Sequence, residues 1–143
     1  MVTWKTNIET AHTVLIISDQ PETTASWSAL FNQRNCIVLC ESVRSGAVQS
    51  ARLMDPSLIV VDIQMNKAER AVFLQDLRAA SRGPILMLIS ANTVEEIVEA
   101  NRAGADECLV KPVNAAVLVI KAMAWLGHGH RSDRLSSPVS VTL

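Results

Sequence analysis

The feature that most constrains this chain is the run from Leu58 to Asp62, with the sequence LIVVD. A strand with one face in water alternates apolar and polar residues, whereas this run has four branched aliphatic residues in succession. It therefore predicts a strand buried on both faces, as in a parallel sheet covered by helices on each side. Asp62 stands at the carboxyl end of this strand, and open α/β sheets bind their ligands at that edge. The run thus indicates a fold class and one candidate functional residue.

Four other short apolar runs are spaced along the chain, and segments with apolar residues at helical spacing separate them. The runs predict strands at residues 14–17, 36–40, 85–89 and 108–110. Helices are predicted from Pro21 to about residue 31 and over about 45–54, 69–80, 93–103 and 114–126, with Val72, Phe73 and Leu77 inward on the third. A strand followed by a helix, five times over, predicts parallel strands joined by crossover helices. The expected fold is α/β, with a doubly wound five-stranded parallel sheet.

Composition and charge exclude several classes of protein. The 143 residues are enough for one domain with a full core, and 49% of them are apolar, which argues against disorder. The net charge of −1 offers no basic surface for nucleic acid, and no apolar run approaches the roughly 20 residues of a membrane span. Residues 1–12 lack the apolar segment of a signal peptide, and the three cysteines form no CxxC pair. We therefore expect a cytoplasmic domain with reduced thiols that pack in its core.

The chain is expected to have three segments. Residues 1–12 form a polar N-terminal arm, residues 13–127 form the domain, and residues 128–143 form a polar, serine-rich linker or tail. A linker at this place predicts that the sequence is a piece of a longer protein with a further domain.

Polar residues able to do chemistry stand at the ends of four predicted strands. They are Asp19, Asp62, Ser90 and Lys111. The carboxyl ends of parallel strands meet at one edge of a sheet, so these side chains are expected to converge, with Lys111 within ion-pair reach of Asp62. Two carboxylates close together favour a bound cation, and hard oxygen ligands with room for water suit Mg²⁺. Because an ammonium and a hydroxyl bind phosphoryl oxygens, the set predicts phosphoryl transfer onto an aspartate.

The segments VLIISDQPE, LIVVDIQM, ILMLISA and GADECLVKP, in this order and spacing, resemble the receiver domain of two-component response regulators. The resemblance extends from about Thr13 to Leu126 and implies the flavodoxin-like receiver fold. It implies a signalling domain, not an enzyme, that takes its phosphoryl group from a sensor histidine kinase. It also implies an output domain after the linker, most commonly one that binds DNA.

The resemblance assigns roles to individual residues. Asp62 matches the phosphoacceptor, and Asp19 matches an acidic ligand of Mg²⁺. Gln64 matches the position that offers its backbone carbonyl to the same ion. Ser90 matches the hydroxyl that responds to phosphorylation, and Lys111 matches the lysine before a proline whose peptide bond is usually cis.

Three positions depart from the family pattern. Ser18 replaces the first of the two acidic residues usual after the first strand, so it would hold Mg²⁺ weakly and through water, at a cost on the order of 10–100-fold in affinity. Asn66 stands where a proline is usual, and the glycine usual further along that loop is absent, which predicts a more helical or more mobile loop. Cys108 replaces an aromatic residue that turns inward on activation, which predicts a weakened switch or one that acts through backbone shifts.

Two functions remain open on this basis. The first is a switch operated by phosphorylation, in which Asp62 attacks the phosphohistidine of a kinase and Lys111 and Ser90 hold the product. The second is a pseudo-receiver, an interaction or dimerisation module that needs no phosphate. The three departures favour the second, and the four intact strand-end residues favour the first. A phosphatase with an aspartyl nucleophile is disfavoured, because such enzymes generally have a second acid where this chain has Gln64.

The last predicted helix carries apolar residues on two faces. One set is spaced to pack against the sheet, namely Val113, Leu118, Ala122 and Trp125. Val117, Ile120 and Ala124 fall on the opposite or flanking side. An apolar stripe that is not buried is a contact surface. We therefore expect a symmetric homodimer through this helix, with Val117 and Ile120 in the contact.

Overall fold

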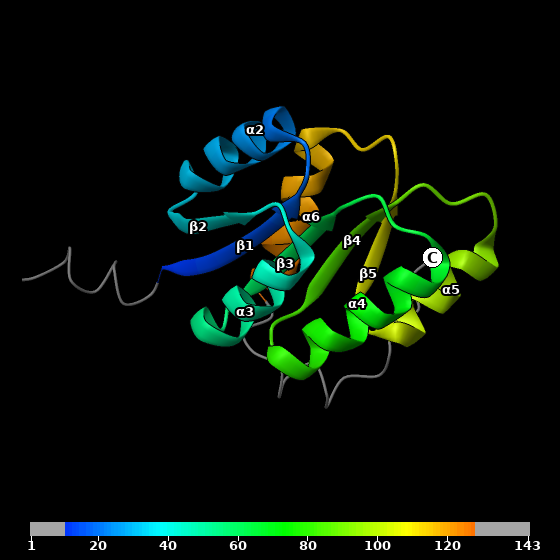
Figure 1. The fold of residues 1–143 in the computed structure, drawn as a ribbon. Coiled ribbons are helices and arrows are strands. Elements are labelled where there is room, and N and C mark those ends of the chain that lie inside the picture. The colour runs from blue at the N-terminus through cyan, green and yellow to red at the C-terminus, as the bar shows by residue number, and fades with distance from the viewer. Residues whose placement is uncertain (1–10, 128–143) are drawn as a thin grey trace, which may run out of the picture.

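A computed structural model describes residues 11–127 (Figure 1). Its strands are β1 (His12–Ser18), β2 (Cys36–Glu41), β3 (Leu58–Asp62), β4 (Ile85–Ile89) and β5 (Glu107–Val110). Its helices are α2 (Pro21–Asn32), α3 (Arg44–Met54), α4 (Lys67–Ala80), α5 (Val94–Ala103) and α6 (Ala115–Gly127). The predicted linker and nearly all of the predicted arm lie outside the described residues.

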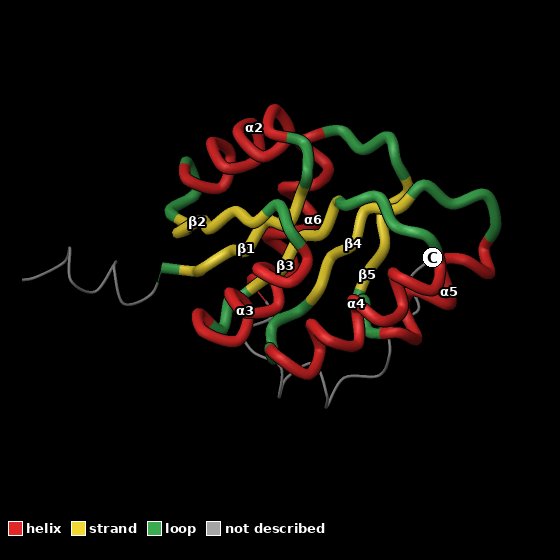
Figure 2. Tube along the Cα trace, in the orientation of Figure 1, coloured by secondary structure: helices red, strands yellow, loops and turns green. Residues whose placement is uncertain are grey.

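The five strands form one parallel sheet in the order β2-β1-β3-β4-β5. Helices α2 and α6 cover one face of the sheet, and α3, α4 and α5 cover the other (Figures 1 and 2). The strand order reverses direction between β1 and β3, which makes this pair the topological switch point of the sheet. The structure confirms the doubly wound, flavodoxin-like α/β fold.

The core consists of two layers, one on each face of the sheet. Along β1, Val14 and Ile16 pack under α2 and α6, whereas Leu15 and Ile17 pack under the other three helices. All five residues of β3, including Asp62, are buried. The run of consecutive aliphatic residues is therefore explained by two covered faces. No helix between residues 11 and 127 has both the length and the apolar character needed to cross a membrane.

The loop after β3 leads into helix α4, whose start is capped by Asn66. Of the two expectations drawn from Asn66, a more helical or a more mobile loop, the structure therefore agrees with the more helical one. The Asn66 Oδ1 accepts a hydrogen bond from the Glu69 N–H at 2.8 Å, and the Glu69 Oε1 accepts one from the Asn66 N–H at 2.9 Å. This reciprocal pair is a capping box. Helix α4 consequently begins at Lys67, directly after the residue that replaces the usual proline.

We expect Asn66→Ala to lower the free energy of unfolding by about 1 kcal/mol, because it removes the acceptor that satisfies the Glu69 N–H. Urea unfolding followed by circular dichroism measures this loss. Asn66→Ser is the matched control, because serine keeps an accepting oxygen at the cap and should retain most of the stability. Equal losses in the two variants would show that the cap does not hold the start of α4.

Two expectations about burial are wrong. Val72 is 58% exposed, although it was expected to face inward with Phe73 and Leu77, which are buried. The inward face of α4 instead includes Leu74, which is two residues further along and lies on nearly the opposite side of the helix from Val72. Cys40 is exposed, so only Cys36 is a fully buried core cysteine, and Cys108 is half-buried. Cys40 lies on β2, one of the two edge strands of the sheet, where several side chains are exposed.

Candidate functional site

The candidate site lies at the carboxyl edge of the sheet, beside the switch point. In the register of β1 with β3, Ser18 is the partner of Asp62, so the end of β1 stands next to the end of β3. A cavity of about 60 Å³ opens at this edge, and Asp62, Gln64, Ser90 and Lys111 are among the residues that line it. At roughly 10–15 Å³ per water, this volume holds a few water molecules or a group of similar size. Three predicted site residues at strand ends therefore share one cavity.

Asp62 and Lys111 form an ion pair. The Lys111 Nζ donates a hydrogen bond to the Asp62 Oδ1 at 2.7 Å, and the Asp62 side chain is only 9% exposed. The Lys111 backbone N–H donates to the Ile89 carbonyl at 2.9 Å, which holds the end of β5 against the end of β4. The expected ion pair is thus present, and the Lys111–Pro112 peptide bond is cis, as the resemblance implied.

Ser90 and Gln64 both line the cavity, each from the loop that follows a strand. Ser90 follows β4 directly, is exposed, and lines the cavity with its hydroxyl group available. Gln64 follows β3 by two residues and is also exposed. Both therefore share the cavity with Asp62.

Asp19 and Ser18 stand next to this cavity without lining it. Asp19 is exposed, whereas Ser18 is 4% exposed and its Oγ accepts a hydrogen bond from the Gln20 N–H at 3.1 Å. The oxygen donors at this edge are the hard ligands that Mg²⁺ prefers, so the residues fit that ion. The described residues contain no group of three or more His, Cys, Asp or Glu able to hold a metal. The donor set therefore carries less negative charge than a site with two acids after β1.

Arg70 also lines the cavity, and the sequence interpretation missed it. The residue is 8% exposed, which is unusual for an arginine. A signal was available in the spacing, since Arg70, Phe73, Leu74 and Leu77 recur at helical intervals and form the buried face of α4. Residue type alone, however, favours the solvent side for an arginine.

Cys108 lies on β5, and its side chain contacts α5. Its Sγ donates a hydrogen bond to the Asn101 Oδ1 at 3.5 Å. Burial raises the pKa of the Cys108 thiol to about 11, and the nearby charge of Arg70 opposes part of that rise. The thiol is therefore protonated at neutral pH and fills only a small part of the space that an aromatic side chain would need.

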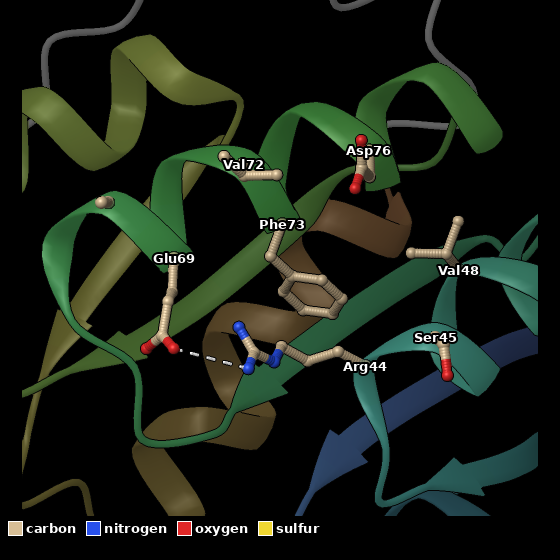
Figure 3. A pocket seen from close by; sticks show the side chains of 8 residues that line it. Arg44, Ser45, Val48, Glu69, Val72, Phe73 and Asp76 are labelled. Atoms are coloured by element: carbon tan, nitrogen blue, oxygen red, sulfur yellow. Dashed lines mark ion pairs between the residues drawn. The ribbon is translucent and has the colours of Figure 1, made fainter.

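A larger hollow, about 490 Å³, lies between α3 and α4 (Figure 3). An ion pair of 3.6 Å between Arg44 and Glu69 spans it, and both side chains are 44% exposed. The rest of its lining includes Val48, Val72 and Phe73. An exposed ion pair contributes little energy and offers no chemistry by itself, so the smaller cavity is the candidate site.

Comparison with known proteins identifies the family. Residues 14–123 match the model of the response regulator receiver domain, and the chain belongs to this family. The transcriptional regulatory protein CpxR of Klebsiella pneumoniae is 29% identical over 123 residues, which cover 85% of this chain and 52% of CpxR. The chain spans about half the length of the curated relatives it matches. It is therefore a two-component signalling domain of the receiver type.

Solved structures agree on the fold. The magnesium-bound receiver domain of the sensor histidine kinase PA1611 from Pseudomonas aeruginosa has a TM-score of 0.68 and 22% identity, over 82% of this chain and 98% of that one. The beryllofluoride-activated NtrC4 receiver domain dimer has a TM-score of 0.70 and 20% identity, over 80% of this chain and 96% of that one. At these identities the likeness shows the CheY-like receiver architecture.

Proposed function

We propose that this domain accepts a phosphoryl group on Asp62 from the phosphohistidine of a sensor histidine kinase, and that the modification changes a contact surface. The observation that carries the proposal is the 2.7 Å ion pair of Asp62 with Lys111, at a cavity that Ser90 also lines. A buried carboxylate held by one cation beside a small open space has a position for one added group. The family supplies the reaction class.

In the proposed reaction an oxygen of Asp62 attacks the phosphorus atom in line with the leaving nitrogen. A P–O bond forms as the P–N bond breaks, and the imidazole leaves with the bonding electron pair and takes up a proton. Because Lys111 holds the Oδ1, the Oδ2 is the oxygen free to attack. Afterwards the ammonium of Lys111 and the hydroxyl of Ser90 bind phosphoryl oxygens. The low exposure of Asp62 strengthens these electrostatic contacts.

Mg²⁺ is the proposed cofactor. Asp19, Asp62 and the backbone carbonyl of Gln64 would hold the ion, and Ser18 would contribute weakly through water. When bound, the ion neutralises charge on the phosphoryl oxygens. Since Ser18 brings no charge and its hydroxyl already accepts from the Gln20 N–H, we expect weak metal binding.

Titration with beryllofluoride and Mg²⁺ tests this proposal, because the complex imitates a phosphoryl group on an aspartate. Isothermal titration should show one binding site per chain. Absence of binding would favour the second candidate, a pseudo-receiver that acts as an interaction module without phosphate. That alternative draws support from the serine at position 18 and from the packed thiol of Cys108 in place of a mobile aromatic ring.

The proposed contact surface is the outer face of α6. Val117 is 45% exposed and Ile120 is 68% exposed, whereas Leu118 and Ala122 are buried against the sheet. Val117 and Ile120 are three residues apart, so they lie next to each other on one face of the helix and form a small apolar patch. We place a second copy of the domain on it, in a symmetric dimer. The NtrC4 receiver domain, which shares the fold, was solved as a beryllofluoride-activated dimer.

Ile120→Glu should convert that dimer to a monomer, because it places a charge in the apolar contact without touching the core. Sedimentation measures the change, and an unaltered circular dichroism spectrum shows that the fold is retained. Val72→Glu is the matched control, because Val72 is a similarly exposed aliphatic residue on α4. The proposal fails if the unmodified protein sediments as a monomer at high micromolar concentration, with and without beryllofluoride.

The remaining partners and the location are also proposals. A sensor histidine kinase is the phosphoryl donor, and an output domain would follow in the longer protein, as the covered share of CpxR suggests. We assign the domain to the cytoplasm, in keeping with its three free cysteines. No contact of this domain with nucleic acid or membrane is proposed.

A further inference from the structure

Arg70 is buried without a partner. The residue is 8% exposed, yet its guanidinium takes part in no hydrogen bond or ion pair recorded among residues 11–127. Two other arginines do have ion-pair partners: Arg44 pairs with Glu69, and Arg78 pairs with Asp106. A buried cation without a counter-ion is unfavourable, because it has lost its water and gained nothing in return. A guanidinium in this position can therefore bind an anion that enters from outside.

The position of Arg70 identifies where that anion binds. Arg70 lies in the first turn of α4, where its backbone N–H donates to the Asn66 carbonyl at 2.9 Å and the capping box fixes the turn. Its side chain lines the same cavity as Asp62, Ser90 and Lys111. The charge of Arg70 also opposes the burial-driven rise in the pKa of Cys108. Arg70 thus lines the site on the side of α5 and β5, where its charge also acts on Glu96.

The charged residues that line the cavity carry one more positive charge than negative charge. Among the lining residues, Arg70 and Lys111 are cations and Asp62 is the single carboxylate. Lys111 is engaged by that carboxylate, which leaves Arg70 with no ion-pair partner in the lining. The carboxylate of Glu96 on α5 lies near enough for the charge of Arg70 to help lower its pKa, but it forms no ion pair with Arg70. A phosphoryl group carries about −1.5 to −2 charges at pH 7, so phosphorylation of Asp62 would supply the missing negative charge. A planar guanidinium can donate two hydrogen bonds to such a group at once.

We infer that Arg70 binds the phosphoryl group carried by Asp62, as a third contact beside Lys111 and Ser90. This inference rests on the proposed function and adds to it a residue that acts only in the modified state. In the unmodified protein Arg70 has no ionic partner, and in the phosphorylated protein it gains one. The contact therefore favours the phosphorylated state and links the first turn of α4 to the site.

The test compares Arg70→Gln with Arg82→Gln in a titration with Mg²⁺ and beryllofluoride. Arg82 is exposed and precedes β4 at the opposite edge of the sheet, so its replacement makes the same charge change away from the site. We expect Arg70→Gln to weaken beryllofluoride binding by about 10- to 100-fold, the range for a lost hydrogen bond to a charged group. Arg82→Gln should bind like the unmodified chain. Equal affinities for all three proteins overturn the inference.

Thermal unfolding separates phosphoryl binding from a structural role. Removal of an unpaired buried cation should leave the melting temperature of the free protein unchanged or raise it. A structural arginine would behave in the opposite way, so a markedly lower melting temperature of Arg70→Gln contradicts the inference. The unmodified chain gives a second measurement, because the Nε–H signal of Arg70 in nitrogen–proton NMR spectra should shift when beryllofluoride binds. An unshifted signal overturns the inference without any substitution.

The proposed function and the role of Arg70 can be overturned separately. If the unmodified chain binds no beryllofluoride, the proposed function is wrong and Arg70 has no phosphoryl group to bind. If the unmodified chain binds it and Arg70→Gln binds it equally well, Asp62 remains the acceptor and only the role of Arg70 is withdrawn.

Discussion

Lys111→Ala is expected to reduce phosphoryl incorporation from acetyl phosphate by about 10²–10³-fold, the usual effect of removing one preorganised electrostatic contact at a reacting group. Lys111 is the residue that holds the Oδ1 of Asp62 at 2.7 Å. Without it, the carboxylate loses its orientation and the developing phosphoryl charge loses a cation. The rate of phosphorylation, followed by intact-mass spectrometry, measures the effect.

Lys67→Ala is the matched control for this experiment. Lys67 also forms an ion pair, with Glu99 at 3.3 Å, but its side chain is 61% exposed and lies outside the cavity. Its loss should change the rate little, since exposed ion pairs contribute little. If Lys111→Ala is phosphorylated as fast as the control, the role assigned to Lys111 is wrong.

Ser18→Asp is expected to tighten Mg²⁺ binding by about 10- to 100-fold, because it restores the second acid that receiver domains usually carry after the first strand. Ser18 is buried and is the register partner of Asp62, so a carboxylate there adds charge directly beside the acceptor. The same proximity should lower the free energy of unfolding in the absence of metal, since two carboxylates then repel each other. Isothermal titration measures the affinity.

Ser18→Asn controls for the size of the new side chain. Asparagine has nearly the shape of aspartate but no charge, so its Mg²⁺ affinity should stay near that of the unmodified protein. Equal affinities of Ser18→Asp and the unmodified chain would mean that position 18 does not influence the metal site.

The order of strands and helices was predictable because each kind of element leaves a pattern in the sequence. A strand covered on both faces is an unbroken apolar run, and a helix has apolar residues at helical spacing. The consecutive aliphatic residues of 58–61 require two covered faces, and the same reasoning locates β1 and β4. The convergence of Asp62, Ser90 and Lys111 follows from parallel strands alone. These inferences need only local patterns and one rule of topology.

Features that depend on the exact phase of a helix or on the edge of the sheet were not predictable in this way. Val72 and Leu74 flank Phe73 and are both aliphatic, so residue type alone does not decide which of them shares the buried face with Phe73. The exposure of Cys40 depends on β2 being an edge strand of the sheet, which no residue in its own apolar run indicates. The burial of Arg70 is a property of the packed site, where residue type alone suggests a solvated side chain.

The most direct test of the central claim is intact-mass spectrometry of the protein incubated with Mg²⁺ and acetyl phosphate. The chain should gain the mass of one phosphoryl group, and the modified peptide should contain Asp62. Asp62→Asn should gain nothing under the same conditions, because the amide cannot attack phosphorus as the carboxylate does. An unmodified chain that gains no mass, or an Asp62→Asn variant that gains as much as the unmodified chain, would contradict the assignment of Asp62 as phosphoacceptor.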